Sequence, residues 1–431
     1  MSGTTIVISP LNWGFGHAGR MIPLALELQR RGNEVIFGAD AGLLPLIENE
    51  LPGIKLVEIP GLRIRYSRCL PQYLSIFLQL PLVIFHAVRE HYLLIRLAEQ
   101  FKPSVIISDN RFGFFHRKIF SVYVTHQVRI PFPRLLGFME PVAAWFHRMI
   151  IRRYDLCLVP DYPGPVNLSG RLSHDLKIPD NVHYMGPLSR FSMPGTLSVL
   201  TMPMTRPGFG TPPDLKGLTM PAPSGDNLTP PETYCCLILS GPEPQRSLLL
   251  EKVSASLRGI RLFVLSATPV KTTIKSDPGI TFIIKPDTET MRHLIAGSSM
   301  VITRAGYTSV MELASLGKGA VLVPTPGQPE QEYLGDYLNG QHGFVSVRQN
   351  KINSLDQFAS TAPSDARAAL TDRAEVIDRA VNPMADSDPL SDNASPPLPE
   401  GGPRVAAPPS LPDSTQLFEK AINLLPEQNK E

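Results

Sequence analysis

Cysteine is scarce in this sequence, with four residues among 431, and no two of them form a C-x-x-C pair. Secreted domains that depend on disulfides carry many more cysteines, so this scarcity favours a reducing compartment. The opening residues, MSGTTIVIS, enter an apolar run at once and lack the basic segment, apolar core and cleavage site of a signal peptide. We therefore expect a cytoplasmic protein.

An excess of charge of one sign is missing as well, because 41 Lys and Arg residues stand against 39 Asp and Glu residues, a formal net charge of +2. This balance gives no general polyanion signature, so we expect no nucleic-acid partner. Metal ligands are equally sparse. The single D-x-D motif, Asp386 to Asp388, lies in a Pro-rich stretch, and the His and Cys residues lack the spacing of a metal site. We expect neither a metal ion nor a cofactor.

The sequence also has no uninterrupted apolar run of membrane-spanning length. The segment from Leu70 to Val88 is about as long as a span, but Gln72, Gln79, Pro81 and His86 interrupt it. This pattern favours a buried or amphipathic helix in the first half of the chain. A surface that rests on the inner face of a membrane is the first alternative, because arginines flank the segment, and a true span is the last.

What the sequence does have is a regular alternation of apolar β runs with helical stretches. TIVIS, EVIFG and SVIISD belong to a first series, and CCLILS, RLFVLS and MVIT belong to a second. Such alternation predicts parallel sheets covered on both faces. We therefore expect an α/β protein with two Rossmann-like lobes that face a central cleft, where the ligand binds.

Two Pro-rich segments without apolar periodicity interrupt this alternation and predict flexible or disordered insertions. The expected organisation is an N-terminal lobe, a linker or insertion, a C-terminal lobe, a disordered segment and a C-terminal helix. Their respective ranges are 1–191, 192–233, 234–360, 361–414 and 415–431.

The stretch NWGFGHAGR, directly after TIVIS, fits the fingerprint G-x-G-x-x-G through Gly14, Gly16 and Gly19. Glycines after a strand let the backbone approach a ligand closely, and the start of the next helix attracts an anion. A plain dinucleotide turn needs neither His17 nor Arg20. The motif therefore predicts a phosphate-facing loop but does not by itself identify the ligand.

The C-terminal lobe contains two further turns of this strand–glycine–helix kind. LSGPEPQRS (Leu239 to Ser247) presents Ser240, Gly241 and Arg246, with an ordinary strand–helix connection as the alternative. The second turn, ITRAGYTS, presents free N–H groups near Gly306 and Thr308, which can hold a diphosphate with help from hydroxyls.

Polar side chains follow this second turn. Glu312 lies about one turn into the helix, where its carboxylate is placed to accept both hydroxyls of a ribose. After the next strand, PTPGQPEQE offers Gln328, Glu330 and Gln331 as groups able to bond sugar hydroxyls.

Arg-Ala-Gly-x-x-[Thr/Ser]-x-x-Glu, followed after a strand by Pro-x-Pro-Gly-Gln-x-Glu-Gln, resembles the C-terminal domain of family 28 glycosyltransferases. This family includes the N-acetylglucosaminyltransferase of lipid II synthesis. The resemblance covers roughly residues 4–190 and 234–347, with residues 302–333 as its most specific part. It implies a GT-B fold, a UDP-sugar held mainly by the C-terminal lobe, no metal, and inversion of the anomeric centre.

The resemblance also implies roles for individual residues. Glu312 would bind the ribose, residues 306–309 the diphosphate, and residues 282–285 would lie against the uracil. Gly14, Gly16 and His17 match the N-terminal glycine loop, which faces the donor phosphates and the acceptor. The full expected donor-binding set is Gly14, Gly16, Ser240, Gly241, Arg246, Ile284, Arg304, Ala305, Gly306, Thr308, Ser309, Glu312, Gln328, Glu330 and Gln331.

Inverting transfer needs a base that takes the proton of the acceptor hydroxyl. His17 is the first candidate, because imidazole titrates near neutrality and this one heads a helix at the cleft. Alternatively, His17 only donates a hydrogen bond to phosphate. Asp109 and His126 follow apolar strands and are the competing bases.

The sequence thus predicts a metal-independent inverting glycosyltransferase that moves N-acetylglucosamine or another hexose from a UDP-sugar to an unknown acceptor, lipid-linked or not. The acceptor is not inherited from the lipid II enzyme, since SDNRFGFFHRKI and VTHQ fit uncharacterised relatives better. A sugar-nucleotide 2-epimerase of the same fold is the first alternative. An NAD-dependent oxidoreductase, with Asp40 as its acid, and a nucleotide-binding protein without activity follow.

Overall fold

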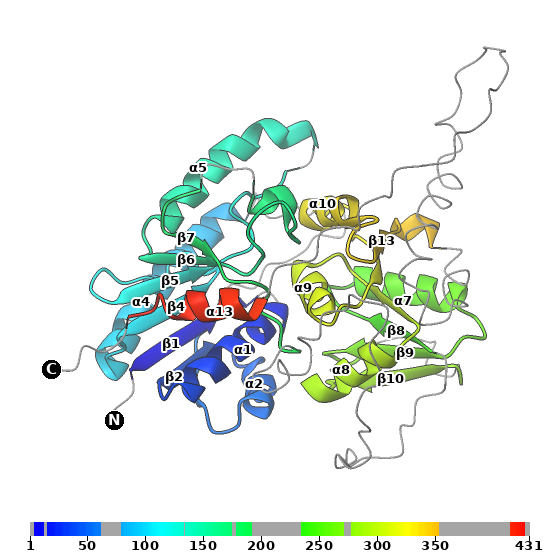
Figure 1. Ribbon diagram of the computed structural model, residues 1–431, viewed down its shortest axis with the longest axis horizontal. Coiled ribbons are helices and arrows are strands. Elements are labelled where there is room, and N and C mark those ends of the chain that lie inside the picture. Colours follow the sequence, from blue (N-terminus) through cyan, green and yellow to red (C-terminus); the bar gives the residue numbers. More distant parts are fainter. Residues whose placement is uncertain are drawn as a thin grey trace, which may run out of the picture.

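The computed structural model contains two separate parallel sheets, one in each half of the chain (Figure 1). Because the sheets are parallel and their strands alternate with helices, the expected α/β architecture of two Rossmann-like lobes is confirmed. The described residues are 4–12, 15–61, 79–132, 134–174, 178–191, 234–270, 277–352 and 414–426.

The N-terminal lobe is built on a seven-stranded sheet in the order β3-β2-β1-β4-β5-β6-β7. Its strand β4 is buried at every position, as a sheet covered on both faces requires. The strands are β1 (Thr5–Pro10), β2 (Glu34–Ala39), β3 (Lys55–Glu58), β4 (Val105–Asp109), β5 (Phe120–Val124), β6 (Leu156–Val159) and β7 (Val182–Tyr184). The α-helices described here are α1 (Phe15–Arg30), α2 (Leu44–Glu50), α4 (Leu80–Phe101) and α5 (Glu140–Ile151), and the 3-10 helices are η1 (Arg134–Met139) and η2 (Gly170–Leu172).

The C-terminal lobe is built on a six-stranded sheet in the order β10-β9-β8-β11-β12-β13. The strands are β8 (Cys235–Ile238), β9 (Leu262–Ser266), β10 (Ile280–Ile284), β11 (Met300–Thr303), β12 (Ala320–Leu322) and β13 (Phe344–Ser346). The helices are α7 (Gln245–Ser256), α8 (Thr288–Gly297), α9 (Tyr307–Ser315), α10 (Pro329–Leu338) and the 3-10 helix η4 (Gln349–Lys351).

Both sheets reverse their strand order at one point, between β1 and β4 in the first sheet and between β8 and β11 in the second. Doubly wound sheets bind ligands outside the carboxyl ends of the strands at such a point. Gly16, at the start of α1, follows β1, and Gly306 follows β11. Each lobe therefore places its glycine turn at the position where this architecture forms a site.

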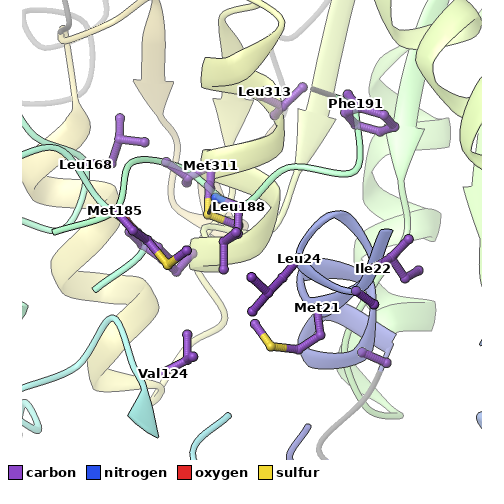
Figure 2. Packing of buried hydrophobic residues seen from close by; sticks show 14 of the residues in the cluster. Met21, Ile22, Leu24, Val124, Leu168, Met185, Leu188, Phe191, Met311 and Leu313 are labelled. Atoms are coloured by element: carbon purple, nitrogen blue, oxygen red, sulfur yellow. Dashed lines mark hydrogen bonds between the residues drawn. The ribbon is translucent and has the colours of Figure 1, made fainter. Parts of the chain in front are cut away.

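A continuous apolar cluster joins the two lobes. Figure 2 shows Met21 and Leu24 of α1 near Leu188, which in turn lies beside Met311 of α9. The backbone N–H of Leu188 donates to Met311 Sδ at 3.1 Å. The last segment of the N-terminal lobe is thus buried against both lobes and packs them together.

A buried arginine fixes the carboxyl edge of the first sheet. Arg111 donates to the carbonyl of Pro10 at 2.8 Å, to the carbonyl of Ile59 at 3.3 Å and to Glu90 Oε1 at 2.9 Å. It therefore ties the ends of β1 and β3 to α4. Arg111 lies two positions after Asp109, so this network also holds the loop that carries the candidate site.

The helix expected between Leu70 and Val88 is described only in part. Residues 62–78 lie outside the described residues, and α4 begins at Leu80 and continues to Phe101. Its apolar side chains are not all buried, since Ile84 is 58% exposed and Phe85 is 60% exposed. Among the described helices, none has both the length and the apolar content to cross a membrane.

The C-terminal helix α13 (Ser414–Ile422) packs on the N-terminal lobe, where Figure 1 shows it crossing the first sheet. Arg31, just after α1, binds Glu419 and donates to Asn423 Oδ1 at 2.7 Å. Residues 192–233 and 361–413, which contain both Pro-rich segments, lie outside the described residues.

Candidate active site

His17 and Asp109 form a pair at the point where the first sheet reverses its order. His17 lies in the first turn of α1, and Asp109 is the last residue of β4, with a fully buried side chain. His17 Nδ1 lies 3.0 Å from Asp109 Oδ2. Two residues that sequence reasoning treated as competing bases are therefore direct partners.

Arg20 binds the same carboxylate from one turn further along α1. Its Nε donates to Asp109 Oδ2 at 3.0 Å, and its Nη2 donates to Asp109 Oδ1. Burial alone would raise the pKa of the Asp109 carboxyl, but the positive charge of Arg20, together with His17, lowers this pKa to about 2. Asp109 is therefore ionised at neutral pH.

His126 lies on the other side of Arg20 and reaches the second lobe. Its Nδ1 lies 3.0 Å from Arg20 Nη1, and its Nε2 lies 3.0 Å from Oε1 of Glu330 on α10. Since the guanidinium can only donate, Nδ1 accepts and Nε2–H donates to Glu330. Burial lowers the pKa of His126, although Glu330 opposes this effect. His126 is therefore a neutral imidazole with both nitrogens occupied.

The glycine loops of the two lobes face each other beside this network. A Cβ atom built on Gly16 would lie 3.1 Å from Thr308 Oγ1, so a larger residue would press on the opposite lobe. Gly306 is the N-cap of α9 in an extended conformation without a side-chain cap. The first backbone N–H groups of α9 are consequently available for an anion. Gly14 lies outside the described residues.

Tyr307, the first residue of α9, packs against the N-terminal lobe. Its ring stacks on His126 with centroids 4.3 Å apart and 5° between the planes. Its hydroxyl donates to the carbonyl of Pro160 at 2.7 Å. The loop expected to hold the diphosphate is thereby locked to the residues around His17.

Glu312 is paired with an arginine that sequence reasoning did not single out. Arg190 Nε donates to Glu312 Oε1 at 2.8 Å, and both side chains are largely buried. Arg190 lies at the end of the N-terminal lobe, 122 positions from Glu312. The contact holds Oε1 of the Glu312 carboxylate from the N-terminal lobe.

Arg304, Ala305 and Gln331 point into the protein. Arg304 donates to the carbonyls of Val323 and Gln245, and its burial lowers its pKa to about 10. Gln331 Oε1 accepts from the backbone N–H of Thr325 at 2.9 Å. These three expected donor ligands are therefore buried, and Arg304 and Gln331 bond to the protein backbone.

The remaining expected residues lie nearer the surface. Gly241 is exposed, with a positive φ of 96° that favours glycine. Arg246 binds Glu243 and Thr268, and Ile284 is 37% exposed at the end of β10. The partly exposed members are Ser240, Gly306, Thr308, Ser309, Gln328 and Glu330.

The sequence carried a partial signal for Arg20 and none for Arg190. Positions three apart on a helix share a face, so a helix beginning near His17 places Arg20 beside it. The contacts of Arg20 with Asp109 and His126 join residues 89 and 106 positions apart, and only the sheet order brings them together.

Comparison with known proteins agrees with this architecture. A sequence model of the glycosyltransferase family 28 C-terminal domain matches residues 266–373, which confirms the resemblance. The UDP-N-acetylglucosamine--N-acetylmuramyl-(pentapeptide) pyrophosphoryl-undecaprenol N-acetylglucosamine transferase 2 of Bacillus thuringiensis (strain Al Hakam) is 46% identical over 44 residues, 10% of this chain and 12% of that protein. The transferase of the same name, without the numeral, from Prosthecochloris aestuarii (strain DSM 271 / SK 413) is 32% identical over 94 residues, 22% of each protein.

These alignments span less than a quarter of the curated relatives' length. Among solved structures, the calicheamicin glycosyltransferase CalG4 superposes with a TM-score of 0.53 at 12% identity, over 90% of this chain and 100% of that one. At this identity the likeness concerns the fold, and the two-lobed GT-B fold is confirmed.

The low pKa of Asp109 predicts a specific loss of stability in acid. A carboxyl with a pKa of 3.8 when unfolded and about 2 when folded stabilises the protein fully above about pH 4, and this contribution is lost as the pH falls through 2. As the pH falls from about 4 to about 2, the unfolding free energy of the unsubstituted protein should decrease. We expect this decrease to be smaller in Asp109→Asn by roughly 2 kcal/mol. Urea unfolding at several pH values measures this.

Glu48→Gln, which removes an exposed carboxylate on α2, serves as the control and should leave the pH dependence almost unchanged. Identical pH dependence in Asp109→Asn and the unsubstituted protein would contradict the assignment.

Proposed function

We propose that this protein is a metal-independent, inverting glycosyltransferase that moves a hexose from a UDP-sugar to an acceptor hydroxyl. The observation that carries the proposal is the pair of His17 and Asp109 facing the N-terminus of α9 across the lobes. N-acetylglucosamine is the first candidate sugar, since the matched relatives are named as N-acetylglucosamine transferases. The match of residues 266–373 to the family 28 domain supports a nucleotide-sugar donor.

His17 is the proposed base. With Asp109 ionised, the proton on Nδ1 is held by the carboxylate, and Nε2 keeps the lone pair. In the proposed step the acceptor oxygen attacks C1 of the sugar and its proton passes to His17 Nε2. The bond between C1 and the phosphate oxygen breaks, and UDP leaves with the electron pair.

The competing bases are less suitable on physical grounds. Asp109 is fully buried and accepts bonds from Arg20 and His17, and its low pKa makes it a weak proton acceptor. Both ring nitrogens of His126 are bonded. We therefore infer that Asp109 orients His17, and that His126 belongs to the supporting network.

The donor is proposed to lie along the C-terminal lobe. The backbone N–H groups at the start of α9, with the hydroxyls of Thr308 and Ser309, would meet the diphosphate, because a helix N-terminus stabilises an anion. Glu312 Oε2 would accept from the ribose. Gln328 and Glu330 would bond the sugar, and Ile284 would lie against the uracil, beside the end of β10.

We propose that the protein contacts a membrane at its surface. A lipid-linked acceptor would be consistent with this location. Apolar side chains on α4 and on η1 with α5 are exposed, among them Phe85 at 60% and Trp145 at 51%. Exposed arginines lie on or directly after the same helices: Arg89, Arg96, Arg152 and Arg153. Apolar groups beside arginines suit the surface of an anionic bilayer.

The donor site is tested by substitution of Glu312. We expect Glu312→Ala to weaken UDP binding by about 2 to 4 kcal/mol, because charge-assisted hydrogen bonds to the ribose are lost. Calorimetry with UDP measures this, and circular dichroism checks that the variant folds despite the unpaired Arg190. Glu251→Ala, which removes an exposed carboxylate on α7, should bind UDP normally. Unchanged affinity in folded Glu312→Ala would exclude Glu312 from the site.

The base is tested by His17→Ala. We expect UDP affinity to stay within about threefold, because the nucleotide lies on the other lobe, while turnover falls by roughly 10² to 10⁴. Turnover is measured as UDP release from UDP-N-acetylglucosamine, with a membrane lipid extract as the acceptor source.

Three other results would each redirect the assignment. Equal losses of affinity and turnover would make His17 a phosphate ligand, and near-normal turnover would return the base role to Asp109 or His126. UDP release by the unsubstituted protein that needs no acceptor would favour epimerase chemistry over transfer.

The membrane contact is tested with vesicles rich in phosphatidylglycerol. We expect the double variant Phe85→Ser, Trp145→Ser to bind at least fivefold less in sedimentation, because both apolar anchors are removed. Leu248→Ser, at a residue 38% exposed on α7 of the other lobe, is the matched control. Equal sedimentation of the double variant and the control would refute the contact.

A further inference from the structure

Arg20 has more hydrogen-bond partners than an arginine needs to neutralise one carboxylate. Its side chain is fully buried, and it donates to Asp109 through Nε and Nη2 and to His126 through Nη1. A guanidinium is a rigid planar fork, so these contacts fix three side chains relative to one another. Arg20 is therefore the geometric centre of the network.

Arg20 also competes for the ring nitrogen that Asp109 uses. His17 Nδ1 lies 3.0 Å from Asp109 Oδ2 and 3.0 Å from Arg20 Nη2. A neutral imidazole nitrogen either donates or accepts, so only one of these contacts is a hydrogen bond at a time. A bond to Asp109 leaves the lone pair on Nε2, whereas a bond from Arg20 puts the proton there. Arg20 Nη2 already donates to Asp109 Oδ1, and the ionised carboxylate is a charged acceptor, so the bond from His17 Nδ1–H to Asp109 prevails and the lone pair stays on Nε2.

His126 extends this network to the opposite lobe. Its Nε2–H donates to Glu330 Oε1 at 3.0 Å, and this bond leaves the Nδ1 lone pair to receive Arg20. The other tautomer of His126 would turn an N–H toward the guanidinium, and two donors would face each other. Glu330, on α10, thereby stabilises the tautomer of His126 that accepts from Arg20.

We propose that Arg20 is a positioning residue for the proposed transfer, which keeps the lone pair of His17 on Nε2 and links this state to docking of the C-terminal lobe through His126 and Glu330. The proposal rests on the proposed function, because it concerns the same base. Arg20 does this by holding both oxygens of Asp109, so that Oδ2 remains aligned with His17 Nδ1.

The charges around His17 give this proposal a measurable consequence. Arg20 on α1 is positive, whereas Asp109 at the end of β4 and Glu330 on α10 are negative, and His126 after β5 is neutral. Without the guanidinium, neither oxygen of Asp109 would be held by Arg20, and Oδ2 would no longer be kept aligned with His17 Nδ1. Both tautomers of His17 would then be populated.

The test reads the ring nitrogens directly, by ¹⁵N NMR of the full chain labelled at histidine, with His17 and His126 assigned from His17→Gln and His126→Gln. In the unsubstituted protein we expect the proton of His17 on Nδ1 and the proton of His126 on Nε2. In Arg20→Gln we expect His17 to show a mixture of its two tautomers. A single Nδ1–H form of His17 in Arg20→Gln would overturn the proposal.

Two further variants keep the test decisive if Arg20→Gln does not fold. Arg20→Lys retains the charge but lacks the planar fork that reaches Asp109 and His126 together, so His126 should show mixed tautomers. Glu330→Leu removes the acceptor on the other lobe and should give His126 mixed tautomers. Persistence of the single Nε2–H form of His126 in both variants would overturn the link between the lobes.

Activity separates this proposal from the proposed function. Turnover in Arg20→Gln should fall at least tenfold with UDP affinity unchanged, which a purely structural defect would not produce. Full turnover in His17→Ala would refute the base itself, whatever the NMR result. Lost turnover in His17→Ala together with normal turnover in Arg20→Gln would refute only the role of Arg20.

Discussion

Arg20 and Asp109 bury opposite charges in the interior of the N-terminal lobe, and the geometry of the candidate site depends on this pair. Transferring two ions from water into protein costs several kcal/mol for each, which is offset only when the pair and its remaining hydrogen bonds are well arranged. Asp109, at the end of β4, accepts hydrogen bonds from Arg20 and His17. Arg20 uses its remaining nitrogen donor on His126. The pair therefore fixes α1 against β4, and His17, one turn before Arg20, inherits a defined position beside the carboxylate.

The same constraint extends across the lobes, because the partners of the pair have partners on the opposite side. His126 bonds Glu330 and stacks on Tyr307, while Arg190 bonds Glu312 near the apolar contact of Leu188 with Met311. An apolar cluster that includes residues from both lobes makes their separation unfavourable. Helix α9 is thus held by contacts at its first residue, Tyr307, and further along at Glu312. Under the proposed function, these contacts would give the base on one lobe a fixed relation to the leaving group on the other.

Local sequence patterns predicted the fold and the loops, but not the side-chain contacts between the lobes that hold the loops in place. Strand, glycine turn and helix are neighbours in sequence, so the elements around Gly306 and the two sheets followed from periodicity and turn chemistry. The pairing of Arg190 with Glu312 and of His126 with Glu330 depends on lobe packing, and local pattern carries no record of it. The apolar segment before Val88 predicted a buried or amphipathic helix, and α4 is amphipathic, since Phe85 is exposed and Leu94 is buried. The sequence left these alternatives open because neighbouring elements decide which face of a helix is covered.

The inward orientation of two arginines also determines how a diphosphate would be held. Arg20 and Arg304 both lie beside glycine turns, yet both are buried and directed at protein groups. Neither is placed to bind a phosphate directly, so under the proposed function the N–H groups at the start of α9 and the hydroxyl of Thr308 would stabilise the charge of the leaving group. Such dipoles are fixed before the substrate arrives, so they require little reorganisation when charge develops on the departing oxygen. The two arginines then act at a distance, one by orienting Asp109 and the other by bracing the end of β11 against the carbonyl of Val323.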